Sequence, residues 1–289
     1  MFSKKSIRVL VQKTDGEFKE GVNTLEFKNL PIEVKIKRNG TSSMSNIKIY
    51  GISKEHINAI TNLPSLGLTQ FAKLNVVVYV DDGGGEFLLY IGSMRDACPH
   101  YTEAPDVYID IQCVAFAFQN LIGDIPPNRF DREASVPDMY RAVCASFNLS
   151  FVDLTKEKQI VQNPPSIDGE NVTARLNQLK DAYKKTTWFN YNETVYIINT
   201  EQYLKSYDIS PKDYIGYPTF NQTGIGLVFD KIVLFKPLSD AIRISGSELD
   251  MVNRKWNIIT IEYNLSTKIG GKWEMGITCV PLWEDKNGS

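Results

Sequence analysis

The sequence contains very few of the residues that enzymes and metal centres most often use. Only two of its 289 residues are histidines, His56 and His100, and only four are cysteines. His100 lies two residues from Cys98, but a structural zinc ion normally takes four ligands and only Cys113 is nearby in the sequence. We therefore expect His100 to be a loop residue beside a buried thiol, and we expect no metal site.

An excess of either charge is also lacking. The chain has 32 basic and 34 acidic residues, which gives a formal net charge of -2. A protein that binds nucleic acid or an anionic membrane surface through a basic patch would carry more positive charge. The balanced surface favours a protein partner, and we expect no nucleic-acid-specific site.

Long hydrophobic runs are absent. The longest, residues 76–80 and 114–118, are far shorter than the roughly 20 residues that span a bilayer. Near the N-terminus, Arg8 and Gln12 interrupt the apolar stretch that a signal peptide requires. We expect no membrane segment and folding in the cytoplasm, where the widely spaced cysteines stay reduced.

Catalytic and phosphate-binding motifs are missing as well. Asp81 and Asp82 precede three glycines, but adjacent acids repel phosphate and no Gly-Lys-Ser/Thr follows, so this segment is expected to be a hairpin tip. No serine lies in a Gly-x-Ser-x-Gly elbow. Two carboxylate pairs could be proposed for glycan cleavage, but they sit beside strands or prolines, as surface acids often do: Asp106 with Asp110, and Asp208 with Asp213. We expect no catalytic residue and no cofactor.

Hydrophobic periodicity divides the chain into three parts. From Ile7 to about Cys113 the apolar residues alternate with polar ones, which is typical of half-buried strands, and residues 54–62 form the one expected helix. After residue 126 the period becomes helical, with Ser135 as an N-cap and a second helix from Val172 to Tyr183. Two strands around an Asn192-Glu193 turn follow.

The last third of the chain returns to alternation. Glycine and proline turns separate its apolar runs, and Gly270-Gly271 permits a tight connection between the last two. The sequence therefore predicts a mainly β protein with a smaller α/β part, in which two barrel-like β domains (residues 1–120 and 206–289) flank a small α/β domain (residues 121–205).

The order of these features resembles that of tailed-phage baseplate hub proteins, the central hubs of contractile tails and related injection machines. The resemblance rests mainly on the C-terminal third: Gly216-Tyr217-Pro218, Gly224-Ile225-Gly226, an aromatic-containing strand closed by a proline at 234–237, Ile242-Arg243-Ile244-Ser245, Trp256 to Leu265, and Gly270-Gly271-Lys272-Trp273. Upstream, Ile91-Gly92, 104–107 and Asn163-Pro164 fall in the same order.

The resemblance implies a structural role. Such hubs form trimers in which two similar barrels per chain produce a pseudo-six-fold ring, and this ring joins the six-fold tail tube to the three-fold central spike. It implies as partners a second and third copy of the chain, the spike, the tube or a tube-initiator protein, and baseplate wedge proteins. It also implies a place in the virion tail baseplate, assembled in the host cytoplasm. Some hubs of this family carry a cell-wall hydrolase, but this chain lacks the residues for one, so we expect no enzymatic activity.

Aromatic and strand residues of the C-terminal part are the candidates for contacts with partners. Tyr217 and Phe220 lie in a turn rich in proline and glycine, where exposure is expected. Trp256, Ile261 and Trp273 lie in apolar runs that serve subunit or core packing. Two alternatives remain open at this point, a tail-associated peptidoglycan hydrolase and a carbohydrate-binding tail module.

Overall fold

The N-terminal part of the molecule consists of strands with one short helix. The computed structural model describes residues 5–67, 73–102, 107–121, 125–200, 202–222 and 224–282. Helix α1 (Lys54–Ile60) confirms the predicted helix, although it ends two residues early. The other elements of this part are β1 (Ser6–Lys13), β2 (Thr24–Phe27), β3 (Ile32–Arg38), β4 (Ser43–Tyr50), the 3-10 turn η1 (Pro64–Leu66), β5 (Leu74–Asp81), β6 (Glu86–His100) and β7 (Tyr108–Val114).

The middle of the chain holds two longer helices. Helix α2 (Val136–Ser146) begins after Ser135, whose Oγ accepts a hydrogen bond from Asp138 N, as predicted. Helix α3 (Val172–Ala182) begins after Asn171, which caps it in the same way. The strands of this part are β8 (Glu133–Ser135), β9 (Ser150–Asp153), β10 (Ile160–Gln162), β11 (Thr186–Tyr191) and β12 (Thr194–Asn199). None of the helices in the described ranges is long and apolar enough to cross a membrane.

The C-terminal part returns to strands, with one difference from the prediction. Residues 230–239 contain no strand, so the expected strand at Leu234–Pro237 is wrong. Pro237 has no N–H to donate and Leu238 has a positive φ of 65°, two properties that disfavour a regular ladder. The elements are β13 (Lys205–Ile209), β14 (Thr219–Phe220), β15 (Ile225–Phe229), β16 (Asp240–Ile244), the 3-10 turn η2 (Asp250–Val252), β17 (Lys255–Ser266) and β18 (Trp273–Pro281).

Strands from both ends of the chain belong to one large sheet. Its order is β14-β15-β18-β17-β3-β4-β7-β6-β5-β1-β2, with β16 attached to β17 and β13 attached to β16. The two ends of the chain meet in the antiparallel ladder between β17 and β3, which runs from Ile261 opposite Arg38 to Ser266 opposite Glu33. The predicted mainly β fold is confirmed. Within the described residues the pairing does not close into a barrel.

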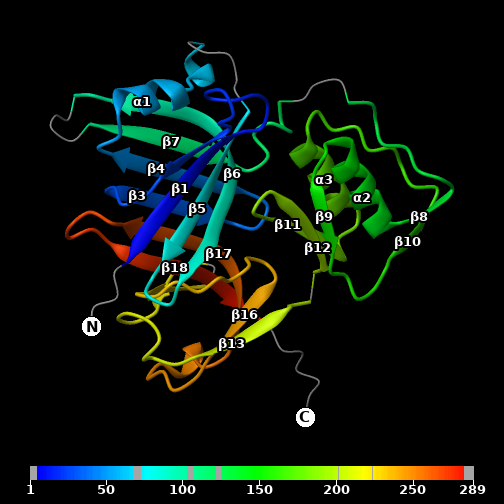
Figure 1. The fold of residues 1–289 in the computed structure, drawn as a ribbon. Coiled ribbons are helices and arrows are strands. Elements are labelled where there is room, and N and C mark those ends of the chain that lie inside the picture. The colour runs from blue at the N-terminus through cyan, green and yellow to red at the C-terminus, as the bar shows by residue number, and fades with distance from the viewer. Residues whose placement is uncertain are drawn as a thin grey trace.

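The large sheet folds over and encloses a core. Figure 1 shows β1, β5 and β6 crossing in front of β3, β4 and β7, and side chains from both groups form one hydrophobic cluster with those of the C-terminal strands. In β3, Val34 and Ile36 point into this core, whereas Lys35 and Lys37 lie on the exposed face. The same strand ends with Arg38, which occupies a core position although it is charged.

A second core lies in the α/β unit, defined here as residues 125–200. Helices α2 and α3 pack together, and α2 contacts the three-stranded sheet β11-β12-β9, in which β9 runs parallel to β12. Val143, Leu176 and Ile197 are fully buried between these layers. The predicted α/β part is therefore present, while the predicted boundaries at 120/121 and 205/206 stay a prediction.

Candidate protein-interaction surface

Two of the predicted interface residues are exposed at one end of the large sheet. Tyr217 exposes 75% of its surface and Phe220 exposes 53%. Phe220 belongs to β14, which is the terminal strand in the order of the sheet. Exposed aromatic side chains are common at protein interfaces, because their large area makes burial by a partner favourable.

Two aliphatic residues that the sequence did not single out extend this surface. Ile215 N donates to Val228 O (2.7 Å), and the two side chains expose 49% and 39% of their surfaces. Val228 alternates with Leu227 and Phe229, which point into the core, so strand alternation was the signal that could have identified it. We call Ile215, Tyr217, Phe220 and Val228 the apolar patch.

The patch is suited to side-chain contacts more than to strand addition. In the β14–β15 ladder, Thr219 pairs with Gly226 and Phe220 pairs with Ile225. The preceding residue is Pro218, which has no N–H to offer to an added strand. Short edge strands that carry proline resist pairing with another sheet. A partner would therefore bury these side chains without lengthening the sheet much.

The other three predicted residues lie inside the chain. Trp256, Ile261 and Trp273 are all buried in the large core, and Trp256 Nε1 donates to Val252 O (2.9 Å). The expectation that their runs serve core packing is consistent with this position. A role for them between subunits stays a prediction.

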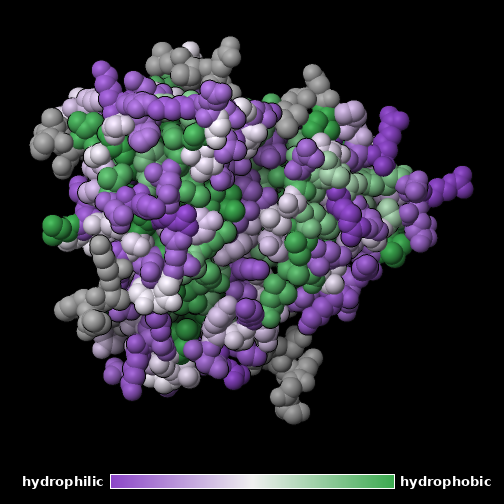
Figure 2. All heavy atoms as spheres, in the orientation of Figure 1, coloured by the Kyte–Doolittle hydropathy of each residue, from purple (hydrophilic) through white to green (hydrophobic). Residues whose placement is uncertain are grey.

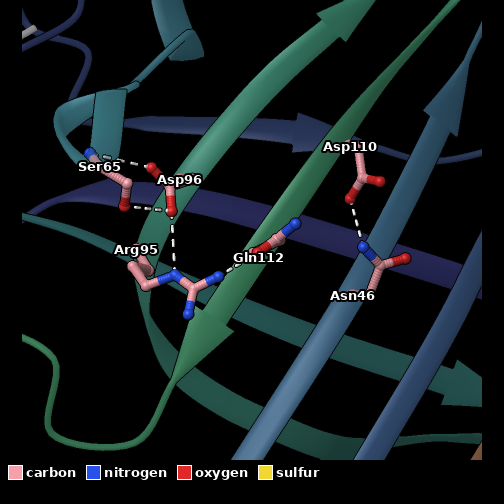
Figure 3. A network of polar contacts seen from close by, with 6 residues as sticks. All are labelled: Asn46, Ser65, Arg95, Asp96, Asp110 and Gln112. Atoms are coloured by element: carbon pink, nitrogen blue, oxygen red, sulfur yellow. Dashed lines mark hydrogen bonds and ion pairs between the residues drawn. The ribbon is translucent and has the colours of Figure 1, made fainter. Parts of the chain in front are cut away.

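Polar residues on the exposed side of β4, β6 and β7 bind one another. Figure 3 shows Arg95, whose Nε donates to Asp96 Oδ2 (2.9 Å) and whose Nη2 donates to Gln112, while Ser65 Oγ also donates to Asp96 (2.7 Å). Nearby, Asn46 donates to Asp110. Figure 2 shows hydrophobic groups dispersed among hydrophilic ones on the face in view.

Among the described residues, no contact brings the two carboxylates of either pair considered for glycan cleavage together as an opposed acid and base. Asp213 accepts hydrogen bonds from Ser210 N (2.9 Å) and Ser210 Oγ (2.8 Å) and lies 3.2 Å from Lys231 Nζ. These contacts, led by the backbone hydrogen bond, lower the pKa of Asp213 to about 2. Asp208 lies on β13, and Asp106 lies outside the described residues.

His100 and Cys98, which were considered for a metal site, make other contacts in the structure. The His100 ring stacks on Tyr108 with centroids 4.7 Å apart, and Cys98 is partly exposed beside it in sequence. In the described ranges no group of three or more His, Cys, Asp or Glu residues could hold a metal ion. All four cysteines are free, and burial raises the pKa of Cys113 to about 12, as expected for a packed thiol.

Comparison with known proteins identifies the fold. No protein-family model matches the chain, and no curated protein matches its sequence. Among solved structures, the tail protein from Neisseria meningitidis MC58 matches with a TM-score of 0.62 and 9% identity, covering 95% of this chain and 96% of that one. The chain has the fold of this tail protein.

Two further structures agree. The 43 kDa tail protein of prophage MuSo2 from Shewanella oneidensis matches with a TM-score of 0.58 and 11% identity, over 94% of this chain and 96% of that chain. The E. coli c3393 protein, a type VI secretion component similar in structure to the T4 tail proteins gp27 and gp5, matches with a TM-score of 0.59 and 10% identity, over 88% and 74%. The resemblance to baseplate hubs seen in the sequence is therefore matched by the fold.

Proposed function

We propose that this chain is a structural baseplate hub protein, a trimeric adaptor that joins the six-fold tail tube to the three-fold central spike. The observation that carries the proposal is the extent of the structural match: the fold of the Neisseria tail protein covers 95% of this chain and this chain covers 96% of it.

The internal arrangement supports this role. Each chain contributes two strand-rich regions, β1 to β7 and β13 to β18, joined by the β17–β3 ladder. In the proposed trimer these regions are the two barrel-like parts, and three copies place six of them around the axis. The α/β unit projects from the side of the sheet in Figure 1 and would lie at the periphery, toward wedge proteins.

The apolar patch supplies a contact for such an assembly. A ring requires that a surface on one copy meet a different surface on the next copy, and exposed aromatic side chains provide the buried area for it. Tyr217 and Phe220 are therefore proposed to face a neighbouring copy, the spike, or the tube or tube-initiator protein. In the infected host the ring would form in the cytoplasm and end in the virion tail baseplate.

Electron microscopy of the purified protein tests the proposal. Negatively stained particles should average to three-fold rings with six similar lobes around the axis. Single-chain particles or two-fold dimers, with no three-fold rings at any concentration, would contradict the hub assignment. Loss of the rings in the Tyr217→Ser/Phe220→Ser double variant, with Tyr101→Ser as the control at an exposed aromatic elsewhere, would place the apolar patch at the interface.

A further inference from the structure

The tip of one hairpin is among the contacts that attach the α/β unit to the large sheet. Asn190 N also donates to Gly40 O (2.9 Å) in the turn between β3 and β4. The turn between β11 and β12 consists of Asn192 and Glu193, and we call these two residues the docking turn. Both have positive φ, 52° and 59°, as a two-residue hairpin of this type requires. Asparagine tolerates this conformation, but glutamate adopts it rarely. The contacts of the Glu193 side chain therefore need to be considered together with its backbone conformation.

The side chains of the docking turn bind the sheet. Asn192 Oδ1 accepts hydrogen bonds from Arg38 Nη2 (2.8 Å) and from Ile91 N (3.3 Å). The Glu193 carboxylate accepts from Ser93 N (3.0 Å), Ser93 Oγ (3.3 Å) and Phe116 N (3.1 Å). Phe116 follows β7 and itself has a positive φ of 57°, so the carboxylate also holds the segment where the chain leaves the sheet.

Few groups compensate a charge on Glu193. On the elements packed against the docking turn, the titratable and charged groups near Glu193 are Arg38 from β3, Tyr90 from β6 and Cys113 from β7. Arg38 is hydrogen-bonded to Leu89 O (2.6 Å) and Asn192, and no ion pair between it and Glu193 is formed in the described structure. Across a pocket of about 360 Å³ that Glu193 lines, Lys73 and Asp15 pair with each other, 3.1 Å apart.

Burial therefore has a larger effect on the pKa of the Glu193 carboxyl than its hydrogen bonds have. It raises the pKa of Glu193 from 4.5 to about 7, against the opposing effect of the donors on Phe116 and Ser93. When the turn leaves the sheet, water solvates the carboxylate and its ordinary pKa returns. The docked state then binds more protons than the undocked state at pH values between the two, so rising pH weakens docking across this interval.

We propose that the docking turn is a pH-responsive conformational device, in which ionisation of Glu193 loosens the α/β unit from the large sheet. The unit is held most firmly in acid, where Glu193 is protonated in both states. It loosens as the pH rises, and the change levels off once the docked carboxyl is itself ionised. The proposal depends only on contacts within one chain and is independent of the proposed hub function.

Hydrogen exchange at the docking contacts tests this device. The amide groups of Ile91, Ser93 and Phe116 donate to the docking turn, so their exchange reports its opening. Protection factors, in which the intrinsic exchange rate at each pH is divided out, should fall on the order of a hundredfold in segments 90–94 and 115–117 from pH 5 to pH 8. The same segments of Glu193→Gln are the reference, because ionisation of Glu193 also lowers the stability of the whole fold and so affects every slowly exchanging amide.

Two variants separate the device from a merely structural contact. Glu193→Gln keeps a side chain of the same size but cannot ionise, so its protection should be independent of pH. Asn192→Ala removes the Arg38 contact and should lower protection at every pH while keeping the wild-type slope. A flat wild-type profile, or a wild-type slope that persists in Glu193→Gln, would overturn the proposal.

Discussion

Two hairpins of this protein place their side chains in opposite ways. The β11–β12 hairpin packs a polar turn, Asn192-Glu193, against the large sheet, where both side chains find donors. The β14–β15 hairpin and the turn before it expose apolar side chains, among them Phe220 and Tyr217, at the end of the same sheet. The first hairpin finds its partners within the chain. The second leaves apolar area that the described part of the chain does not cover, which makes it the better candidate for assembly.

The largest effect is expected where a charge is buried without any partner. Ile261→Asp places a carboxylate at a fully buried core position of β17. We expect a loss of at least about 4 kcal/mol in the free energy of unfolding, because the apolar core around position 261 offers the new carboxylate no hydrogen-bond donors like those that Glu193 has. Expression and urea denaturation measure it. Asn264→Asp, on the opposite face of the same strand, is the matched control, and equal stability of the two variants would show that the assigned faces are wrong.

A smaller loss is expected when a buried partner of the docking turn is removed. Arg38→Ala leaves Leu89 O without its side-chain donor and Asn192 Oδ1 with Ile91 N as its remaining donor, and it removes a cation placed 4.4 Å from the centre of the Tyr191 ring. The expected cost is about 3 kcal/mol in urea denaturation. Lys37 lies on the same strand as Arg38. Lys37→Ala breaks an exposed ion pair with Glu262 of β17 and should cost about 0.5 kcal/mol. Similar losses in both variants would contradict a special role of Arg38.

The charge state of Glu193 should give a pH-dependent difference of intermediate size. Its raised pKa means that the folded protein gains protons relative to the unfolded chain, so stability falls as the pH rises from about 4.5 to 7. Relative to Glu193→Gln, the wild type should lose about 2 kcal/mol of unfolding free energy from pH 5 to pH 8. Parallel pH profiles of the two proteins would show that Glu193 does not titrate in this range.

The smallest effect on stability is expected at the apolar patch. The Tyr217→Ser/Phe220→Ser double variant should unfold within about 1 kcal/mol of the wild type, because both side chains are exposed in the single chain. Its association, measured by light scattering, should require at least a tenfold higher concentration. Unchanged association would move the interface to another surface, and a large loss of stability would show that the two aromatic residues pack within the chain.

Sequence patterns predicted helix starts and turns well, because neighbouring residues determine these features. The Ser135 cap, the α3 start at Val172 and the Asn192-Glu193 turn are all found where the residues indicate them. Leu234–Pro237 is the exception, because a proline and a left-handed residue interrupt a run of apolar residues that otherwise resembles a strand.

Long-range pairing was not visible in the sequence. The β17–β3 ladder joins residues more than 200 positions apart, and neither strand has a sequence pattern that identifies the other as its partner. A register shift between Ile258 and Thr260 also places Ile258 and Ile261 in the same core, although they would face opposite sides of a regular strand.

The candidate sites were only partly predictable for the same reason. Tyr217 and Phe220 were found because a turn rich in proline and glycine indicates exposure, whereas the docking turn depends on contacts with distant strands. The sequence does carry one local signal for this turn: Arg38 follows Val34 and Ile36 at the spacing of the buried face. A charged residue on an apolar strand face indicates that a buried partner is needed.

The solution mass of the purified chain, measured by light scattering over a concentration series, is the most direct test of assembly into a hub. Self-assembly into a hub predicts a mass three times that of one chain, reached as the concentration rises and stable above that point. A mass of one chain at every concentration would contradict a self-assembling trimer, and it would leave the apolar patch as a binding site for a different protein.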